Sequence, residues 1–257
     1  MGKFLWTVVL SHKNIMNIYS NSFFHRVKYY NIIELILEQG FKAFYCKEEI
    51  FLGKNRNSAY IGIPMVSFCD IPLSNVANNH YGKFGIAMSR KWGRERHLEP
   101  VLYYPTDTSC QSTKMIIKAV DNFLNNRKNY DSYRILGYSK PMTKPTKVSG
   151  VSSDNYAERE WRKVYANPSP LKWLTLEEYN IYRGDQSVPK QPKGTPLHFK
   201  VDDIDFILVD KNHVNTLLNF IVNKLVYIGG FSKQITVSEK WTLLSKILVY
   251  EDLLNNL

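Results

Sequence analysis

The chain reads SFFHRV at 22–27 and YYNIIELILEQG at 29–40. The first segment is short, aromatic and partly β-branched, which predicts a strand. The second carries apolar residues three and four positions apart, as in a helix with one buried stripe, and Gly40 follows as a C-terminal cap. A strand therefore runs into a helix, and His25 lies close to their junction.

Two further apolar segments predict strands that lie next to each other. Residues 63–73 read IPMVSFCDIPL, and we expect a buried strand broken by Pro64 and Pro72. Residues 84–90 read FGIAMSR and predict the neighbouring strand. Additional strands are expected at 98–104 and 158–165, a strand pair at 197–209, and helices at 113–125, 211–225 and 237–256.

The order of these segments indicates the fold class and the domain organisation. Strands and helices do not alternate strictly, which favours an α+β fold with a mixed, mainly antiparallel sheet and flanking helices over a doubly wound parallel sheet. No Pro/Gly-rich linker divides the 257 residues, so we expect a single domain over 1–257, with a C-terminal helical segment at about 211–257. Residues 126–153 are rich in Lys, Arg, Asn, Ser and Pro and predict a mobile basic loop.

The charge balance points to a polyanionic partner. The chain has 34 Lys and Arg against 23 Asp and Glu, a formal net charge of +11, so its surface should attract nucleic acid. The alternative is that many small intracellular proteins are basic without a specific partner. The candidate nucleic-acid-binding residues lie in the basic loop and are Lys128, Arg134, Lys140, Lys144 and Lys147.

Cysteine usage and the N-terminal segment suggest the compartment. The three cysteines are widely spaced and form no CxxC pair, so neither a disulfide framework nor a zinc site is signalled. The N-terminal MGKFLWTVVL has no small-residue cleavage site, and its apolar run is too short to span a bilayer. We therefore expect a soluble cytoplasmic protein with no membrane partner and no bound metal.

The sequence lacks the usual phosphate-loop, dinucleotide-binding, nucleophile-elbow, zinc-protease and EF-hand motifs. The first remaining candidate for a catalytic site is EREW at 158–161. Glu158 and Glu160 lie two residues apart, so on an extended strand both point to one side, with Arg159 on the other. One carboxylate could stabilise a developing oxocarbenium ion while the other orients a hydroxyl or a nucleophile. The alternative is a solvated edge strand with alternating charges.

Two other segments place polar residues near strand ends. His25 lies at the mouth of a strand, although a lone histidine beside two phenylalanines is more often a core residue than a functional one. In SFCD…HYGKFG, the residues Ser67, Asp70, His80 and Tyr81 flank strands, and nearby glycines would let a ligand approach the backbone. The alternative for that segment is a glycine-containing turn.

Taken together, these segments resemble the AbiGi family of abortive-infection proteins, which act in phage resistance. The resemblance extends over nearly the full chain and matches order and spacing as well as residue types. It implies a role in anti-phage defence, and family descriptions include an antitoxin component. The segments that carry it are FHR at 24–26, NIIELILEQGF at 31–41, Glu48-Glu49, IPMVSFCDIPLSN at 63–75, HYGKFGIAMSRKW at 80–92, EPVLYY at 99–104, EREWR at 158–162 and DDIDFILV at 202–209.

A more distant similarity is to the ADP-ribosyltransferase fold, including the DarT-type enzymes that modify nucleic acid. The shared layout is a strand with a histidine, a helix ending in glycine, aromatic strands and a late ExE strand. It implies that His25 contacts a ribose of NAD, that Tyr81 stacks on nicotinamide, and that Glu160 is the catalytic carboxylate. The expected NAD-binding residues are His25, Arg26, Ser67 and Tyr81, and the expected catalytic pair is Glu158 and Glu160.

The leading hypothesis is therefore an NAD-dependent ADP-ribosyltransferase that modifies nucleic acid, as the toxic effector of an anti-phage system held inactive by an inhibitory partner protein. The alternative is a non-catalytic, antitoxin-like or nucleic-acid-binding component of such a system. A third possibility is a nuclease that uses Glu158, Glu160 and Asp70, although their spacing predicts no metal-ligand cluster.

Overall fold

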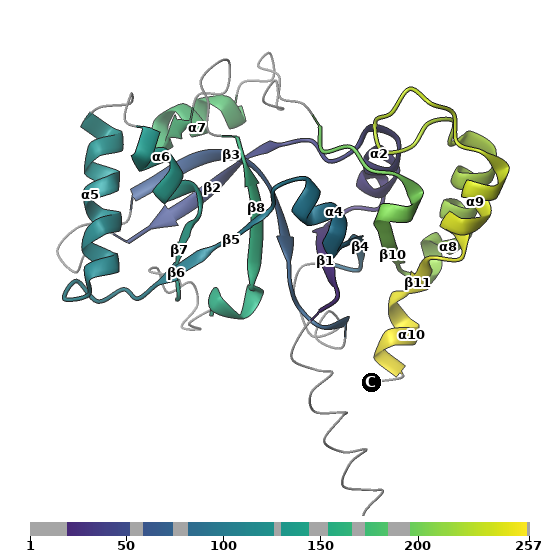
Figure 1. Cartoon of the computed structure of the whole chain (residues 1–257), viewed down its shortest axis with the longest axis horizontal. Coiled ribbons are helices and arrows are strands. Elements are labelled where there is room, and N and C mark those ends of the chain that lie inside the picture. Colours follow the sequence, from purple (N-terminus) through teal and green to yellow (C-terminus); the bar gives the residue numbers. More distant parts are fainter. Residues whose placement is uncertain are drawn as a thin grey trace, which may run out of the picture. The chain divides into compact units, whose positions relative to one another are not determined.

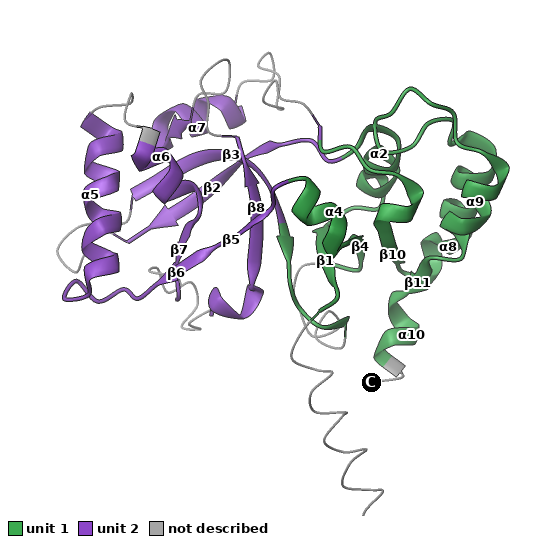
Figure 2. Cartoon of the chain, viewed as in Figure 1, with its two compact units in different colours: residues 1–40, 68–96, 197–257 green, residues 41–67, 97–196 purple. Residues whose placement is uncertain are grey.

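The computed structural model describes residues 20–51, 59–73, 82–125, 130–143, 154–165, 173–184 and 196–255. The chain divides into two compact units, and each unit combines segments that are distant in the sequence (Figure 1, Figure 2). Unit 1 comprises residues 1–40, 68–96 and 197–257, and unit 2 comprises residues 41–67 and 97–196.

Unit 1 is built on a sheet with the strand order β11-β10-β4-β1. Strands β1 and β4 are antiparallel along their whole length, from Ser22 opposite Ser89 to Val27 opposite Phe84. Strand β10 is antiparallel to β4 and parallel to β11, so the sheet is mixed and mainly antiparallel, as the sequence predicts. The strands are β1 (Ser22–Val27), β4 (Phe84–Ser89), β10 (Ile204–Val209) and β11 (Ile247–Val249).

The helices of unit 1 are short and amphipathic. Helix α2 buries Ile33, Ile36 and Leu37, which belong to the apolar stripe that its sequence predicts. The α-helices are α2 (Asn31–Gln39), α4 (Arg90–Glu95), α8 (Val214–Asn219), α9 (Val237–Leu244) and α10 (Tyr250–Asn255). Single turns at η2 (Val201–Asp203) and η3 (Lys211–His213) are 3-10 helices, and η4 (Phe220–Lys224) is a π-helix.

Gly40 ends α2 as predicted. Its φ of 76° lies in the region that side chains disfavour, and its N–H donates to the carbonyl of Ile36 at 2.9 Å. A second glycine completes the cap, because the N–H of Gly229 donates to the carbonyl of Leu37 at 2.6 Å. The backbone approaches Gly40 so closely that a Cβ atom there would lie 2.8 Å from the carbonyl oxygen of Leu197.

Unit 2 combines short strands with three helices. Strand β2 pairs antiparallel with β3, β9 pairs antiparallel with β3, β5 pairs antiparallel with β8, and β6 is parallel to β7. Its core joins Ile61 and Ile63 of β3 to Ile116, Val120 and Phe123 of α5. The strands are β2 (Phe44–Ile50), β3 (Ala59–Cys69), β5 (Glu99–Pro100), β6 (Leu102–Tyr104), β7 (Ser139–Pro141), β8 (Glu160–Val164) and β9 (Leu174–Thr175); the helices are α5 (Gln111–Asn125), α6 (Tyr130–Gly137), α7 (Leu176–Gly184) and the 3-10 turn η1 (Tyr156–Glu158).

Two predictions about β3 are wrong. Pro64 does not break the strand, since β3 continues through it and places it opposite Tyr45 of β2. The carbonyl of Pro64 accepts from the N–H of Tyr165, on the side of β3 that faces away from β2. In a strand, the N–H and the carbonyl of one residue point to the same side. The N–H that proline lacks would therefore not have donated to β2, and no hydrogen bond between β2 and β3 is lost. Strands β3 and β4 are also not neighbours, because Phe24 of β1 pairs with Cys69 on one side and with Ala87 on the other.

Other predicted boundaries are corrected as well. Within the expected basic loop at 126–153, the described residues form helix α6 and strand β7, because one face of α6 buries Ser132 and Leu136. The expected strand pair at 197–209 contains one strand, β10, and the expected helix at 237–256 is interrupted by β11, which pairs with β10. The predicted strand at 98–104 divides into β5 and β6, whereas the helix expected at 113–125 is confirmed as α5.

The single domain over 1–257 stays a prediction, because two units of one chain can still unfold together. The described part of the C-terminal segment from 211 is helical at 211–224, 237–244 and 250–255, with a non-helical stretch at 225–236 and strand β11 between α9 and α10. Among the described residues, no helix has both the length and the apolar character needed to cross a bilayer.

We predict that Gly40→Ala lowers the free energy of unfolding by about 2 kcal/mol, because alanine at positive φ is strained and its Cβ would meet backbone. Urea denaturation followed by circular dichroism measures the change. Gly184→Ala is the matched control, since a Cβ there meets nothing within 4 Å. Equal stability of the two variants would show that the α2 cap is not under this constraint.

Candidate functional site

Five charged side chains of unit 2 gather around β8. They come from four places in the chain: one from β2, one from β7, one from η1 and two from β8. Each of them makes at least one ion pair with another member. We call this group the carboxylate cluster, and its members are Glu48, Lys140, Glu158, Glu160 and Arg162.

Arg162 is the buried centre of the carboxylate cluster. Its side chain has no exposed surface, and its Nε donates to Glu160 Oε1 at 2.7 Å. Its Nη2 donates to Glu48 Oε2 at 2.8 Å, and its Nη1 donates to the carbonyl of Gly137 at 3.1 Å. Burial alone would lower the pKa of Arg162, but the carboxylates of Glu160 and Glu48 raise it above its ordinary value. The guanidinium therefore stays charged inside the protein.

Both carboxylate oxygens of Glu160 are occupied. Oε1 accepts from Arg162 Nε, and Oε2 accepts from Arg162 Nη2 at 3.0 Å and from Lys140 Nζ at 2.9 Å. Only 6% of the residue is exposed. Burial would raise the pKa of Glu160, but the positive charges of Arg162 and Lys140 hold it well below its usual range. Glu160 is thus an ionised, fully paired carboxylate.

Glu158 has the opposite electrostatic character. Burial, followed by repulsion from Glu160 and Glu48, raises its pKa to about 8, although its Oε2 accepts from Lys140 Nζ at 2.6 Å. A protonated Glu158 leaves two carboxylates against two cations, which balances the charge of the carboxylate cluster. A carboxyl group that titrates near neutral pH is suited to proton transfer.

The two glutamates meet by a different geometry from the one predicted. Strand β8 begins at Glu160, not at 158, and Glu158 ends the turn η1. Arg159 between them has a left-handed backbone with φ 45° and ψ 53°, which reverses the chain direction locally. The N–H of Glu160 donates to Tyr103 Oη at 2.8 Å and holds the start of β8 in place. The shared contact with Lys140 brings the carboxyl groups together.

The expected NAD-binding residues belong to β1, to β3 and to a segment outside the described residues. His25 and Arg26 are consecutive in β1 of unit 1; the ring of His25 lies 5.4 Å from that of Phe68, and Arg26 Nη2 donates to the carbonyl of Gly82. Ser67 is in β3 within unit 2, and Tyr81 lies outside the described residues. Strand β1 pairs with β3 where Phe24 lies opposite Cys69, two residues after Ser67, and within unit 2 Lys140 brings together Glu158 and Glu160.

The two described candidates for nucleic-acid binding, Arg134 and Lys140, have different environments. Arg134 is exposed on α6 and makes a loose ion pair with Asp131 at 3.8 Å, whereas Lys140 is engaged by the two glutamates of the carboxylate cluster. The remaining candidates, Lys128, Lys144 and Lys147, lie outside the described residues.

Asp70, considered for a nuclease, is a buried residue of unit 1 whose carboxylate accepts from Arg90. In the part of the chain that the structure describes, no group of three or more His, Cys, Asp or Glu side chains is arranged to hold a metal ion.

Sequence reasoning missed the roles of Glu48, Lys140 and Arg162. The spacing of Glu160 and Arg162 was a usable signal, because residues two apart on a strand share a face and opposite charges there attract. No local pattern could have brought Glu48 or Lys140 to that face, since both arrive through pairing of distant segments.

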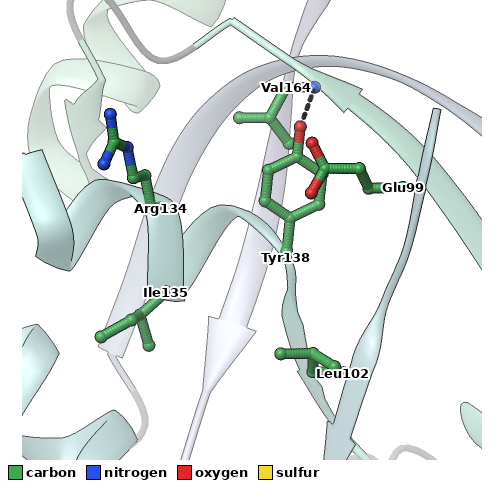
Figure 3. Close-up of a pocket in the computed structure, with 6 residues that line it drawn as sticks. All are labelled: Glu99, Leu102, Arg134, Ile135, Tyr138 and Val164. Atoms are coloured by element: carbon green, nitrogen blue, oxygen red, sulfur yellow. Dashed lines mark hydrogen bonds between the residues drawn. The ribbon is translucent and has the colours of Figure 1, made fainter. Parts of the chain in front are cut away.

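A pocket of about 420 Å³ lies in unit 2 (Figure 3). It is beside the carboxylate cluster, because its lining residue Glu99 pairs with Arg162 across β5 and β8. Val164 of β8 forms part of its wall and lies on the same side of the strand as Arg162, two residues earlier. The hydroxyl of Tyr138 accepts from the N–H of Val164 at 3.4 Å. The lining residues are Glu99, Leu102, Arg134, Ile135, Tyr138 and Val164.

Comparison with known proteins gives a consistent picture. The family model described as "Putative abortive phage resistance protein AbiGi, antitoxin" matches residues 39–210, a range that contains the whole carboxylate cluster. The abortive phage resistance protein AbiGi of Lactococcus lactis subsp. cremoris is 28% identical over 224 residues, which cover 74% of this chain and 87% of that protein. No solved structure matches significantly, so the resemblance to the ADP-ribosyltransferase fold gains no support from a structural neighbour.

We predict that Glu158→Gln flattens the pH dependence of stability. The native pKa of about 8 exceeds the usual value of 4.5, so the stabilising contribution of Glu158 is complete below about pH 4.5 and is lost as the pH rises through 8. The variant should therefore gain on wild type by about 1 to 3 kcal/mol between pH 5 and pH 9. Urea denaturation across this range measures the difference. The exposed Glu177→Gln is the control, and its unfolding free energy should vary with pH as in wild type. Parallel curves of unfolding free energy against pH for wild type and Glu158→Gln would contradict the raised pKa of Glu158.

Proposed function

The chain belongs to the AbiGi family of abortive phage resistance proteins, and from this premise we propose that it is a non-catalytic, antitoxin-like component of an anti-phage defence system. In this role it binds and neutralises a partner toxin, and it also binds nucleic acid. The word "antitoxin" in the description of the matching family model supports the first part. The net charge of +11 supports the second.

The observation that carries the non-catalytic reading is the state of Glu160. A carboxylate that stabilises an oxocarbenium ion or holds a ribose hydroxyl needs an oxygen that can face the substrate. Both oxygens of Glu160 instead accept from Arg162 and Lys140, and the residue is 6% exposed. Removing it from a buried pair would cost several kcal/mol. Glu160 is thus better suited to holding unit 2 together than to catalysis.

An exposed apolar patch in unit 1 is the surface that we assign to the partner toxin. On α9, Val237 and Trp241 are one turn apart and are 72% and 66% exposed. The segment at 222–227 adds three further exposed apolar side chains, and α9 contacts η4 directly. Exposed tryptophan and tyrosine are frequent energetic centres of protein interfaces. The apolar patch comprises Val222, Val226, Tyr227, Val237 and Trp241.

Three lysines and one glutamate, Glu239, occur in the segments that carry the apolar patch, so the charge there is positive on balance. Lys240 lies between the members of the apolar patch, with Nζ donating to the carbonyl of Val222 at 2.8 Å, and Lys224 and Lys233 are exposed in the adjoining segments. This positive charge fits a partner whose apolar contact surface carries acidic residues. A second copy of the chain fits less well, because pairing the same patch with itself would bring like charges together.

ADP-ribosyl transfer from NAD to nucleic acid is the second candidate. One observation favours it: Glu158 is a carboxyl group with a pKa of about 8, adjacent to the strained backbone of Arg159, and such features are frequent at active sites. In that case Glu158 would carry the proton transfer, and Glu160 would only position Lys140.

We predict that the chain expressed alone is harmless and that it restores growth when co-expressed with the toxic component of its own defence system. Trp241→Glu should weaken the complex by roughly thirty-fold or more and abolish protection, since it places a charge at the centre of the apolar patch. Ser238→Glu, on the exposed face of the same helix, is the control and should retain protection. Growth arrest by the chain alone, relieved by Glu160→Gln, would contradict the antitoxin-like role.

We predict that the purified protein transfers no label from labelled NAD to RNA, single-stranded DNA or cell protein. The physical reason is the complete pairing of Glu160. Label on one of these pools that disappears in Glu158→Gln and persists in the exposed control Glu177→Gln would establish the transferase and name its substrate class.

A further inference from the structure

The pocket beside the carboxylate cluster has the composition of a small-ligand site. Its volume of about 420 Å³ lies within the range of roughly 300–1,000 Å³ that such sites occupy. Leu102, Ile135 and Val164 supply apolar wall, and Tyr138 adds an aromatic ring (Figure 3). The hydrogen bond from the N–H of Val164 fixes the position of the Tyr138 hydroxyl. A flat ligand could therefore stack on a ring that is already oriented.

Two opposite charges complete the lining. Arg134 extends from α6, and Glu99 comes from β5 (Figure 3). Among the described residues, Arg134 forms an ion pair with Asp131 at 3.8 Å, and both side chains are more than three-quarters exposed. That pair is therefore weak and can exchange for a phosphate. Within the described residues, the Glu99 carboxylate makes no ion pair. The pocket thus offers a ligand one guanidinium cation, from Arg134, and two carboxylate oxygens that accept hydrogen bonds, from Glu99.

These groups define the ligand by its chemistry. A planar ligand with apolar faces suits the ring and the aliphatic walls, an edge with N–H donors suits the carboxylate, and an attached phosphate suits the guanidinium. An unstacked base of a single-stranded nucleic acid has all three features. Among the bases, guanine has two adjacent donors, N1–H and the 2-amino group, which match the two oxygens of a carboxylate. Uracil presents one donor between two carbonyl oxygens, which a carboxylate repels.

We propose that this pocket binds one unstacked guanine of a single-stranded nucleic acid, with Tyr138 stacking on the base, Glu99 accepting from its N1–H and 2-amino group, and Arg134 contacting a neighbouring phosphate. The inference rests on the nucleic-acid-binding part of the proposed function and gives it a base preference. It does not depend on the partner toxin.

The test measures binding of fluorescein-labelled octamers by fluorescence anisotropy, in RNA and DNA versions. One octamer has a single central guanine among uridines or thymidines, one has hypoxanthine at that position, and one has neither. Hypoxanthine lacks the 2-amino group and so removes one donor. We expect the guanine octamer to bind roughly ten-fold more tightly than the plain octamer, with the hypoxanthine octamer between them.

Variants separate the roles of the two charges. Glu99→Gln should abolish the guanine preference and leave the affinity for the plain octamer similar. Arg134→Glu should weaken all octamers and reduce the slope of log affinity against log salt by about 1. Arg183→Glu on α7 is the matched charge control, and equal unfolding free energies verify that the variants are folded.

The outcomes distinguish the guanine-binding pocket from nucleic-acid binding by the protein in general. Binding without a guanine preference, or a preference that survives Glu99→Gln, overturns the pocket assignment and leaves nucleic-acid binding standing. Absence of binding to every octamer overturns the pocket assignment together with the nucleic-acid part of the proposed function.

Discussion

The guanidinium of Arg162 is completely buried, and three separate segments supply its hydrogen-bond acceptors. Glu48 comes from β2, the carbonyl of Gly137 from the end of α6, and Glu160 from β8 itself. Burying a guanidinium is unfavourable unless each donor direction is met, and loss of one partner leaves an uncompensated charge. These hydrogen bonds therefore fix the positions of β2, α6 and β8 relative to one another. Because α6 and β8 also line the neighbouring pocket, the same bonds determine its shape.

The sequence predicted those elements whose type can be read from a local residue pattern. The strand at 22–27, helix α2 with its glycine cap and helix α5 follow from apolar spacing and one backbone preference, which neighbouring residues decide. Strand order did not follow in this way: β1 lies between β3 and β4 because of pairing between distant residues. The polar composition of 126–153 was misleading for a related reason, since α6 needs only a narrow buried face to pack on α5.

The candidate site illustrates the same limit. Alternation along EREWR correctly suggested that two glutamates converge, but the strand begins later than expected, and convergence depends on Lys140 from β7. Spacing also gave no indication that burial and two neighbouring carboxylates would raise the pKa of Glu158, while Arg162 and Lys140 lower the pKa of Glu160. Two carboxyl groups that look alike in the sequence thus differ in protonation because of side chains that arrive from elsewhere, and this difference moves the functional reading from catalysis toward binding.

Unit 1 is assembled from three stretches that are far apart along the chain. Its strand β4 pairs with β1 on one side and with β10 on the other, and the carbonyls at the end of α2 are capped by Gly229. A ribosome releases β1, α2 and β4 more than 100 residues before β10 and Gly229, so this sheet and this helix end stay incomplete until those later segments have been made. The protein can acquire its finished unit 1, and with it the apolar patch, only after the segment that carries β10, Gly229 and α9 has been synthesised, so products truncated before that segment are poor competitors for a partner.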